Sequence, residues 1–415
     1  MKHRAPNVLT AVDKKTHGRR RRLISQGLSD SSTRGFEDTI KQHVEKLCNQ
    51  ISPGHSDAST QWSRSHDLSR WSSYLTFDIM ADIVFGQQYN LLGDDENRYV
   101  VDSIEGSNIR TGVLIQAPEA SIWRLDRHLF PKSIQCRNKF IEFISRLVLD
   151  RMTTSPLKRN DIISHLLTAK DKETNEGFTK NEVMAESTTL VVAGTDTSST
   201  AISATFFYLT HYPGFYQRAA AEVRSAFATS KDVKIGSRLN ACIFTRACIE
   251  ESLRMSPPAG SALWRQVLDG GQIVDGHVIP SGCDIGVCIY AIHHNDAYFT
   301  DPFDFKPDRW LPNDEVAMEK ARLGRSAYNP FSIGPRSCIG KGFAMAELML
   351  TVVTMLIKFD IRRSSGREGC IGQGSVEAGD GRHRLDEFQL YDHVTAYKKG
   401  PALQFRSRGP ASLPA

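Results

Sequence analysis

Apolar residues recur at steps of three and four along much of the chain, a spacing that places them on one face of an α-helix. The clearest such stripe consists of Leu68, Trp71, Leu75, Ile79 and Ile83. Residues 36–51 have a helical pattern as well, and residues 343–357 are apolar on nearly every side apart from Glu347, as in a fully buried helix. We therefore expect a mainly helical protein.

The longest helical pattern begins near Thr179, which forms a capping-box sequence with Glu182, and runs to Tyr212, before Pro213. A helix of this length spans roughly 50 Å, enough to cross a domain. Its middle, residues 193–200, reads Ala-Gly-Thr-Asp-Thr-Ser-Ser-Thr, which is poor helix material. The small residues leave room for a flat ligand, and the hydroxyls can bond to the preceding turn and open the helix locally. On its own, the stretch would more simply be a buried face rich in Ser and Thr.

A smaller β region is expected in the second half of the chain. Residues 273–290 are rich in strand formers and contain the hairpin signal Asp275-Gly276. Further strands are expected around Phe388 and Leu403. The fold class that follows is mainly α with a smaller β region.

The composition of the chain excludes several classes of function. Its 415 residues are 40% hydrophobic and 24% charged, as in an ordinary soluble globular protein, and the net charge of +5 is too small to indicate binding to nucleic acid. The 8 cysteines include no C-x-x-C pair, so a reduced, intracellular setting is expected and neither a zinc site nor a thioredoxin motif is indicated. His293 and His294 have no acidic or cysteine partner at ligand spacing, which favours a packing role. The sequence shows no signal peptide and no apolar run of transmembrane length.

Candidate chemistry centres on residues 331–340, Phe-Ser-Ile-Gly-Pro-Arg-Ser-Cys-Ile-Gly, immediately before the apolar helix. A thiolate that binds a metal needs a lowered pKa, backbone N–H donors directed at sulfur and shielding from water. Gly334, with the proline that follows it, allows a bend that presents amides to Cys338. Arg336 supplies positive charge and a planar group suited to a carboxylate. A lone cysteine is otherwise most often a buried structural residue.

Two further residues complete a motif around this cysteine. Gly340 has no side chain, so a flat cofactor could approach the backbone closely, and Phe331 could cover the sulfur. With every position of Phe-x-x-Gly-x-Arg-x-Cys-x-Gly filled, the chain resembles the cytochrome P450 family, and the structural-cysteine interpretation is not favoured. The resemblance implies a P450 fold and a haem b cofactor, with iron bound by the thiolate of Cys338 and a haem propionate paired with Arg336.

The same resemblance gives a role to the middle of the long helix. Residues 193–197 match the family's (Ala/Gly)-Gly-x-Asp-Thr groove. The match implies that Asp196 and Thr197 deliver protons to dioxygen. An acid–alcohol pair with a little water can do this without flooding the pocket.

A basic segment, residues 14–22, has two interpretations. It could be a solvated basic face or a nuclear-import patch. However, His17 and Arg21 match the family pattern Trp/His-x-x-x-Arg on one helical face. The resemblance implies that Arg21 meets a haem propionate and that neighbouring basic residues meet the reductase. Because four arginines are adjacent, the register is open by one residue.

Glu251 and Arg254 stand at positions i and i+3 of an expected helix. As a surface pair they would contribute little, and a lone E-x-x-R is weak evidence of function. Residues 305–310, Phe-Lys-Pro-Asp-Arg-Trp, follow at family distance, and the resemblance implies that Arg309 joins the pair in a buried structural triad. Arg265 lies where the family often has another propionate partner.

The function implied is that of a haem-thiolate monooxygenase, an oxidoreductase that inserts one atom of O2 into a small apolar organic substrate. Electrons are expected from NADPH through a separate NADPH-cytochrome reductase, since the sequence has no flavin or nicotinamide fingerprint. The basic segment is most similar to members of fungal specialised (secondary) metabolism. The family expectation for location is the cytosolic face of the endoplasmic reticulum membrane.

Residues 102–132 correspond to the lid over the substrate channel, where Trp123 and Phe130 contact substrate or membrane, or pack in the core.

The chain is expected to be one haem-binding domain, residues 1–415, that lacks the family's anchor and its first sheet and helices, because Arg21 already corresponds to the third helix. This leaves open a non-catalytic or impaired haem-binding remnant. A peroxide-using or isomerising haem-thiolate enzyme is a further alternative. The intact Asp196-Thr197 pair argues against it, because such enzymes need no delivered protons.

Overall fold

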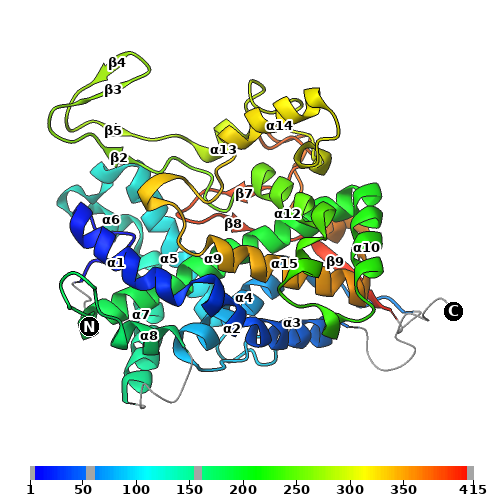
Figure 1. Ribbon diagram of the computed structural model, residues 1–415, viewed down its shortest axis with the longest axis horizontal. Coiled ribbons are helices and arrows are strands. Elements are labelled where there is room, and N and C mark those ends of the chain that lie inside the picture. Colours follow the sequence, from blue (N-terminus) through cyan, green and yellow to red (C-terminus); the bar gives the residue numbers. More distant parts are fainter. Residues whose placement is uncertain (1–4, 53–60, 154–160, 409–415) are drawn as a thin grey trace.

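The computed structural model describes residues 5–52, 61–153 and 161–408, and helices make up most of this part of the chain (Figure 1). The α-helices are α1 (Lys14–Gly27), α2 (Asp30–Gly35), α3 (Glu37–Ile51), α4 (Leu68–Phe85), α5 (Tyr99–Gln116), α6 (Leu125–Leu129), α7 (Pro131–Thr153), α8 (Ile162–Thr168), α9 (Lys180–His211), α10 (Pro213–Ala226), α11 (Ser237–Asn240), α12 (Ile243–Met255), α13 (Ile289–His293), α14 (Glu315–Ala327) and α15 (Lys341–Lys358). Short 3-10 helices are η1 (Pro118–Arg124), η3 (Ser230–Asp232), η4 (Pro307–Trp310), η5 (Gly334–Arg336) and η6 (Gly366–Cys370). The strands are β1 (His66–Asp67), β2 (Arg265–Gln266), β3 (Gln272–Val274), β4 (His277–Ile279), β5 (Asp284–Ile285), β6 (Phe359–Arg363), β7 (Leu390–Tyr391), β8 (Tyr397–Lys398) and β9 (Ala402–Ser407).

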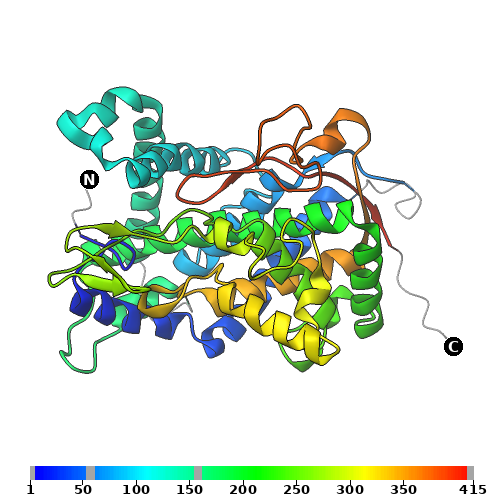
Figure 2. The same ribbon diagram turned by 90° about the horizontal axis from the view of Figure 1, so that it is seen from above.

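Helix α9 runs through the middle of the molecule in both views (Figures 1 and 2). It begins with the predicted capping box, in which Thr179 and Glu182 each bond to the other's backbone N–H, and it ends at His211, one residue before the predicted end. The helix stays continuous through residues 193–200, so the expected local opening does not occur. Hydroxyls there do bond back to the preceding turn, as Thr200 Oγ1 does to the Asp196 carbonyl at 2.8 Å.

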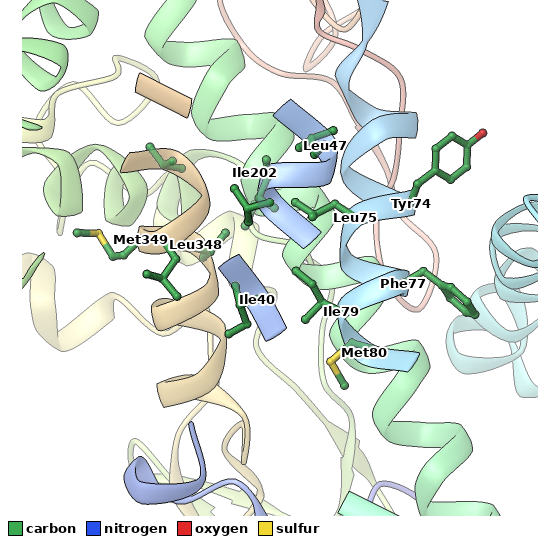
Figure 3. Packing of buried hydrophobic residues seen from close by; sticks show 14 of the residues in the cluster. Ile40, Leu47, Tyr74, Leu75, Phe77, Ile79, Met80, Ile202, Leu348 and Met349 are labelled. Carbon is green, nitrogen blue, oxygen red and sulfur yellow. The ribbon is translucent and has the colours of Figure 1, made fainter. Parts of the chain in front are cut away.

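The core lies between α3, α4, α9 and α15 (Figure 3). Leu75 and Ile79 point from α4 toward Ile202, whereas Tyr74 points to the opposite side of α4. The predicted stripe on this helix is confirmed, with Trp71 half-buried and the other members buried. Because α4 is apolar on more than one side, it packs against neighbours on both faces and stays in the interior.

The small residue Gly194 permits the close approach of α9 to α4. A Cβ atom at this position would lie 2.4 Å from the Met80 sulfur, a distance that two atoms cannot adopt. In addition, Thr76 Oγ1 of α4 donates a hydrogen bond to the Thr195 carbonyl of α9 at 2.9 Å. Of the two small residues predicted to leave room for a flat ligand, Gly194 therefore serves helix packing on the side facing Met80, whereas Ala193 is exposed.

The predicted buried helix after the cysteine motif is confirmed as α15, which is buried from Phe343 onward except for a few half-buried positions. Its one acidic residue, Glu347, is completely buried. Among the described residues, no helix combines the length and the apolar character that crossing a membrane requires.

The β region is small, as predicted. Strands β1, β9 and β6 form a three-stranded antiparallel sheet, and the remaining strands form the pairs β2–β5, β3–β4 and β7–β8. The predicted hairpin turn lies between β3 and β4, with positive φ angles of 48° at Asp275 and 79° at Gly276. This pair projects from the body of the molecule (Figure 1). The strand pattern ends earlier than expected, because Ile289 begins α13.

Candidate active site

The cysteine motif forms a tight turn that ends directly before α15. Ser332 and Gly334 have positive φ angles of 56° and 75°, and the Cys338 N–H donates to the Phe331 carbonyl at 2.7 Å. The left-handed conformation at Gly334 is one that glycine adopts without steric cost. Together these features hold the cysteine at the mouth of a cavity.

This cavity has a volume of about 200 Å³ and lies between α9 and the cysteine turn. Its mostly apolar lining includes Thr197, Ser198, Ala201, Leu263, Phe331 and Cys338. A Cβ placed on Gly340 would have no neighbour within 4 Å, so the space beside the turn is open. Cys338 and Thr197 thus face one space from two elements.

The environment of Cys338 acts on its sulfur in two opposing ways. The side chain is accessible from the cavity, yet the surrounding protein raises the pKa of the Cys338 thiol by burial. The Gly340 N–H and the charges of Arg21 and Lys341 act in the opposite direction and lower this pKa. Donors of this kind stabilise a thiolate, the form in which cysteine binds a metal ion.

Three arginines gather on the other side of the turn, around a cavity of about 680 Å³ lined by Arg21, Arg265 and Arg336. Buried His17 adjoins them, and burial and the charges of Arg336, Arg21 and Arg265 lower its pKa. Burial and the charge of Arg265 lower the pKa of Arg336. Within the described residues, none of the three arginines forms an ion pair with a carboxylate. Such a cluster is suited to binding the anionic groups of a ligand.

Of the four adjacent arginines of α1, only Arg21 reaches the cysteine turn among the described contacts, and Arg19 and Arg20 both pair with Glu182. Arg20 pairs with Glu186 at 2.8 Å and with Glu182, and Arg22 pairs with Asp171 at 2.9 Å. Arg21 instead donates to the Ser337 carbonyl at 2.6 Å, next to the cysteine. The sequence left open by one residue which of these arginines reaches the site, and in this structure it is Arg21.

Arg336 and Arg265 are held by backbone oxygens. Arg336 donates to the Ala11 carbonyl, and Arg265 donates to the Trp264 carbonyl at 2.8 Å. Arg265 is exposed at the start of β2. Their guanidinium groups line the same cavity as Arg21, although the three residues come from distant segments.

The expected proton-delivery pair is split between two sides of α9. Thr197 lines the cavity, and its Oγ1 donates to the Ala193 carbonyl at 2.7 Å. Asp196 is buried and accepts hydrogen bonds from Asn108 Nδ2 at 2.8 Å and from Thr395 Oγ1 at 2.7 Å. Burial raises the pKa of Asp196 above its ordinary value. The alcohol therefore faces the cavity, and the acid faces a polar network behind it.

The structure brings Glu251, Arg254 and Arg309 together in the interior. The Glu251 carboxylate binds Arg254 at 2.9 Å and Arg309 at 2.9 Å, and it also accepts from the Trp310 indole N–H at 3.0 Å. Burial acts to raise the pKa of Glu251, but the two arginines hold it below its ordinary value. Arg254 donates further to the carbonyls of His293 and Pro302 at 2.7 Å, so the cluster fixes the loop that follows α13.

Sequence reasoning assigned no role to several buried titratable residues, two of which bond to serines of α9. Glu347 accepts a hydrogen bond from Ser198 at 2.5 Å, and burial raises its pKa to about 8. Lys398, near the end of the chain, donates to Ser199 Oγ at 2.6 Å. An acid within an apolar helix was a signal for Glu347, whereas nothing around Lys398 in the sequence distinguished it from a surface lysine. The adjacent histidines have the packing role that was predicted, and the described residues contain no cluster of potential metal ligands.

Comparisons with known proteins identify the family. The sequence model described as Cytochrome P450 matches residues 1–372. The chain belongs to the cytochrome P450 family. This P450 is 71% identical over 408 residues to a cytochrome P450 monooxygenase of Gibberella zeae, covering 98% of this chain and 93% of the relative. It is 48% identical to the cytochrome P450 monooxygenase AKT7 of Alternaria alternata, covering 98% and 78% of the two chains. The crystal structure of the cytochrome P450DA heme domain superposes with a TM-score of 0.73 at 19% identity, covering 97% of this chain and 79% of that one.

The P450 is therefore an oxidoreductase of the monooxygenase class, and its mainly helical fold is that of P450 haem domains. Its residues fit a haem: an accessible sulfur, open space beside Gly340, and arginines that have no carboxylate partner among the residues that the structure describes. Cys338 would bind the iron, and Arg21 and Arg336 would hold the propionates. When bound, the haem supplies the iron at which O2 is activated. The protein itself excludes water through the apolar lining and holds a proton at Thr197 Oγ1.

Proposed function

We propose that this P450 uses haem b to insert one atom of O2 into a small apolar organic substrate, with electrons from NADPH supplied by a separate NADPH-cytochrome reductase. The observation that carries the proposal is that Cys338 and Thr197 line the same apolar cavity. A thiolate ligand favours cleavage of the O–O bond, and an alcohol on the opposite wall can pass on the protons that this cleavage needs. The alternative of a non-catalytic remnant is not favoured, because both groups are in place.

The proposal is tested with the purified, haem-loaded chain and a fungal NADPH-cytochrome reductase. A panel of apolar substrates is incubated under isotopically labelled dioxygen, and products are analysed by mass spectrometry. We expect one labelled oxygen atom per product and none from labelled water. Oxygen derived from water, or turnover supported by peroxide and not by NADPH and O2, would contradict the proposal.

A setting in fungal specialised metabolism is also part of the proposal. It is supported by the basic segment, residues 14–22, and by the fungal sources of the relatives. Deletion of the gene, followed by comparison of metabolite extracts, tests it. We expect a precursor lacking one oxygen atom to accumulate, whereas a defect in primary growth would contradict this setting.

For location, we propose the cytosolic face of the endoplasmic reticulum membrane. The support is an exposed apolar surface on the lid, which consists of Ile115, Ile122, Trp123, Leu125 and Leu129. The sequence left open that Trp123 packs in the core. This does not apply, because Trp123 is 89% exposed. Flotation with phospholipid vesicles is expected to capture the protein and to fail for Trp123→Ser combined with Leu129→Ser. Equal flotation of both forms would contradict a contact at this surface.

We further propose that residues 1–415 act as a single haem-binding domain. One continuous cluster of buried apolar residues, which includes Ile24 and Phe405, supports this proposal. A single cooperative unfolding transition, with haem loss at the same temperature, is expected in calorimetry and absorbance. Two separate transitions would contradict it.

A further inference from the structure

Lys398 is a buried lysine whose charge has no ion-pair partner in the part of the chain that the structure describes. Its side chain is 5% exposed, and its Nζ donates to Ser199 Oγ at 2.6 Å and lies 3.5 Å from Ser73 Oγ. Removing an ammonium group from water is costly, and hydroxyl groups compensate for this only in part. A methionine or leucine would fill the same space without that cost. The charge itself therefore requires an explanation.

The explanation lies in the segment that carries Lys398. Three residues earlier, Thr395 Oγ1 donates to Asp196 Oδ2 at 2.7 Å. Asn108 Nδ2 of α5 donates to the same carboxylate oxygen at 2.8 Å and to Thr395 Oγ1 at 3.1 Å. Thus the turn between β7 and β8 supplies a direct donor to the acid, and β8 supplies a buried cation. The cation's acceptor, Ser199 Oγ, donates to the Asp196 backbone carbonyl at 3.0 Å.

The backbone of this turn is fixed against its surroundings. The Ala396 N–H donates to the Pro258 carbonyl at 2.8 Å, and the Ala396 carbonyl accepts from Thr200 Oγ1 at 3.5 Å. Opposite the turn, a Cβ on Gly112 of α5 would lie 2.9 Å from the His393 Cα. The positions of Thr395 and Lys398 relative to α9 are therefore set by packing on two sides.

The charges of Asp196 and Lys398 act on each other. Burial raises the pKa of Asp196, and the charge of Lys398 is the strongest influence in the opposite direction. Burial lowers the pKa of Lys398, and the charge of Asp196 is likewise the strongest opposing influence. Other titratable and charged groups facing the two are His393, Glu105, Arg70 and Asp67. Glu105 in turn pairs with Arg70 at 3.2 Å.

We propose that Lys398 is a positioning residue of this P450, whose ammonium group balances the negative charge left on Asp196 each time this carboxyl group, on the side of α9 away from the cavity, gives up a proton. The proton is replaced from solvent, and Lys398 itself keeps its protons throughout. The inference rests on the proposed function, since it concerns delivery of protons to O2. What is new is the role of a cation on β8, a strand that contains none of the haem-binding motifs.

The test compares Lys398→Met, which removes the charge, with Lys398→Arg, which keeps it. A matched control is Lys358→Met, the same substitution at a partly exposed ion pair with Glu45. Without the cation, the carboxyl group should stay protonated to higher pH, by about one unit or more. The carboxyl band in infrared difference spectra, recorded against Asp196→Asn, measures this protonation without any substrate. We expect the shift for Lys398→Met, and none for Lys398→Arg or Lys358→Met.

Turnover gives a second measurement. Product per NADPH should fall about fivefold or more in Lys398→Met, with peroxide released, because general acid catalysis is impaired. In the background of Asp196→Asn, the Lys398→Met substitution should have no further effect on coupling. An equal loss in both backgrounds, or an unshifted carboxyl band, would overturn the proposal and leave Lys398 as a packing residue.

Two further outcomes, failure of the proposed function and failure of a variant to fold, can be told apart from the results above. Suppose that the wild-type protein forms no labelled product, but the carboxyl band of Lys398→Met is shifted relative to that of the wild type. The proposed function then fails, and the link between Lys398 and Asp196 stands. If Lys398→Met does not fold, Lys398→Gln, which keeps a donor to Ser199, replaces it. Failure of both to fold, with Lys398→Arg intact, would show that the charge serves stability, and the proposal would be wrong.

Discussion

At the scale of single residues, Cys338 differs from the other exposed cysteines in what surrounds it. Cys338→Ala is expected to abolish the thiolate-type difference spectrum of the reduced, carbon-monoxide-bound protein, because among the described residues no other sulfur lines the cavity beside α9. Cys370→Ala is the control, since this exposed cysteine lies at the end of η6, where its Sγ donates to the Gly366 carbonyl at 3.9 Å. Retention of the spectrum in Cys338→Ala and its loss in Cys370→Ala would show that the ligand is misassigned.

Thr197→Ala is expected to bind haem normally and to consume NADPH, but to release peroxide in place of product. The hydroxyl donates to the Ala193 carbonyl within its own helix, and Thr197 lines the cavity, so we expect its removal to leave the packing of α9 intact. Product and peroxide per NADPH are measured together. Thr197→Ser, which keeps the hydroxyl, should retain most of the coupling. An unchanged product yield in Thr197→Ala would indicate another route for protons.

Residues differed in how well their roles could be predicted from the sequence. The residues of the turn around Cys338, 331–340, lie within ten positions of it, so a local motif describes them, whereas Arg21 reaches the turn from a distant segment. Lys398 and its acceptor Ser199 are 199 positions apart, and the sequence around either one contains no sign of the other. Asp196 and Thr197 could be named from their motif, but their separation onto two sides of α9 depends on which helices pack there.

At the scale of elements, the cluster around Glu251 connects α12 to η4 and to the loop after α13. Glu251→Ala and Arg254→Ala are expected to lose folded, haem-loaded protein. Removing one partner of a buried ion pair leaves an uncompensated charge, which costs about 3–5 kcal/mol. That is a large share of the free energy of unfolding of a typical domain. The measurements are soluble yield, haem content and melting temperature.

A matched control for this prediction lies on α14. Glu319 and Arg322 have the same i, i+3 spacing, but their side chains are 65% and 76% exposed. Glu319→Ala should therefore change the melting temperature little. If Glu251→Ala also melts like the wild type, the buried cluster is not a stabilising element.

Elements with strong local signals, the β3–β4 hairpin included, were predicted well, and the shortest paired strands were not. The start of α9 is encoded by a capping box and its end by a proline, both within a few residues of the boundary. Strands β2, β5, β7 and β8 are two residues long, too short for an alternating pattern to show. Their existence depends on pairing across the fold, which no local pattern specifies.

At the scale of the whole molecule, Glu347 couples stability to pH. Burial raises its pKa from 4.5 to about 8 in the folded protein. The pKa of this carboxyl group is higher in the folded protein than in the unfolded protein. Its contribution to the free energy of unfolding is therefore fully present below the unfolded pKa and is lost as pH rises toward the folded pKa. Between about pH 4.5 and about pH 8, the free energy of unfolding should fall by a few kcal/mol from this residue alone. Above that range, its contribution no longer changes.

Glu347→Gln removes this dependence while keeping an acceptor for Ser198. Melting temperatures of the two forms should be similar at about pH 5 and should diverge in favour of the variant at about pH 8. The control is Glu377→Gln, at an exposed glutamate. Parallel curves for wild type and Glu347→Gln would show that the buried carboxyl group does not titrate in this range.

The arginine-lined cavity is formed by two segments that lie near opposite ends of the sequence. Arg21 donates to Ser337, 316 positions later, and Arg336 donates to Ala11, 325 positions earlier. During translation, α1 therefore leaves the ribosome long before the turn that it must meet. A nascent chain that ends anywhere before residue 338 would lack Cys338, the cysteine proposed to bind the iron. Capture of haem is thus an event that follows synthesis of most of the polypeptide, so haem added to cells after translation has stopped should still load the protein already made.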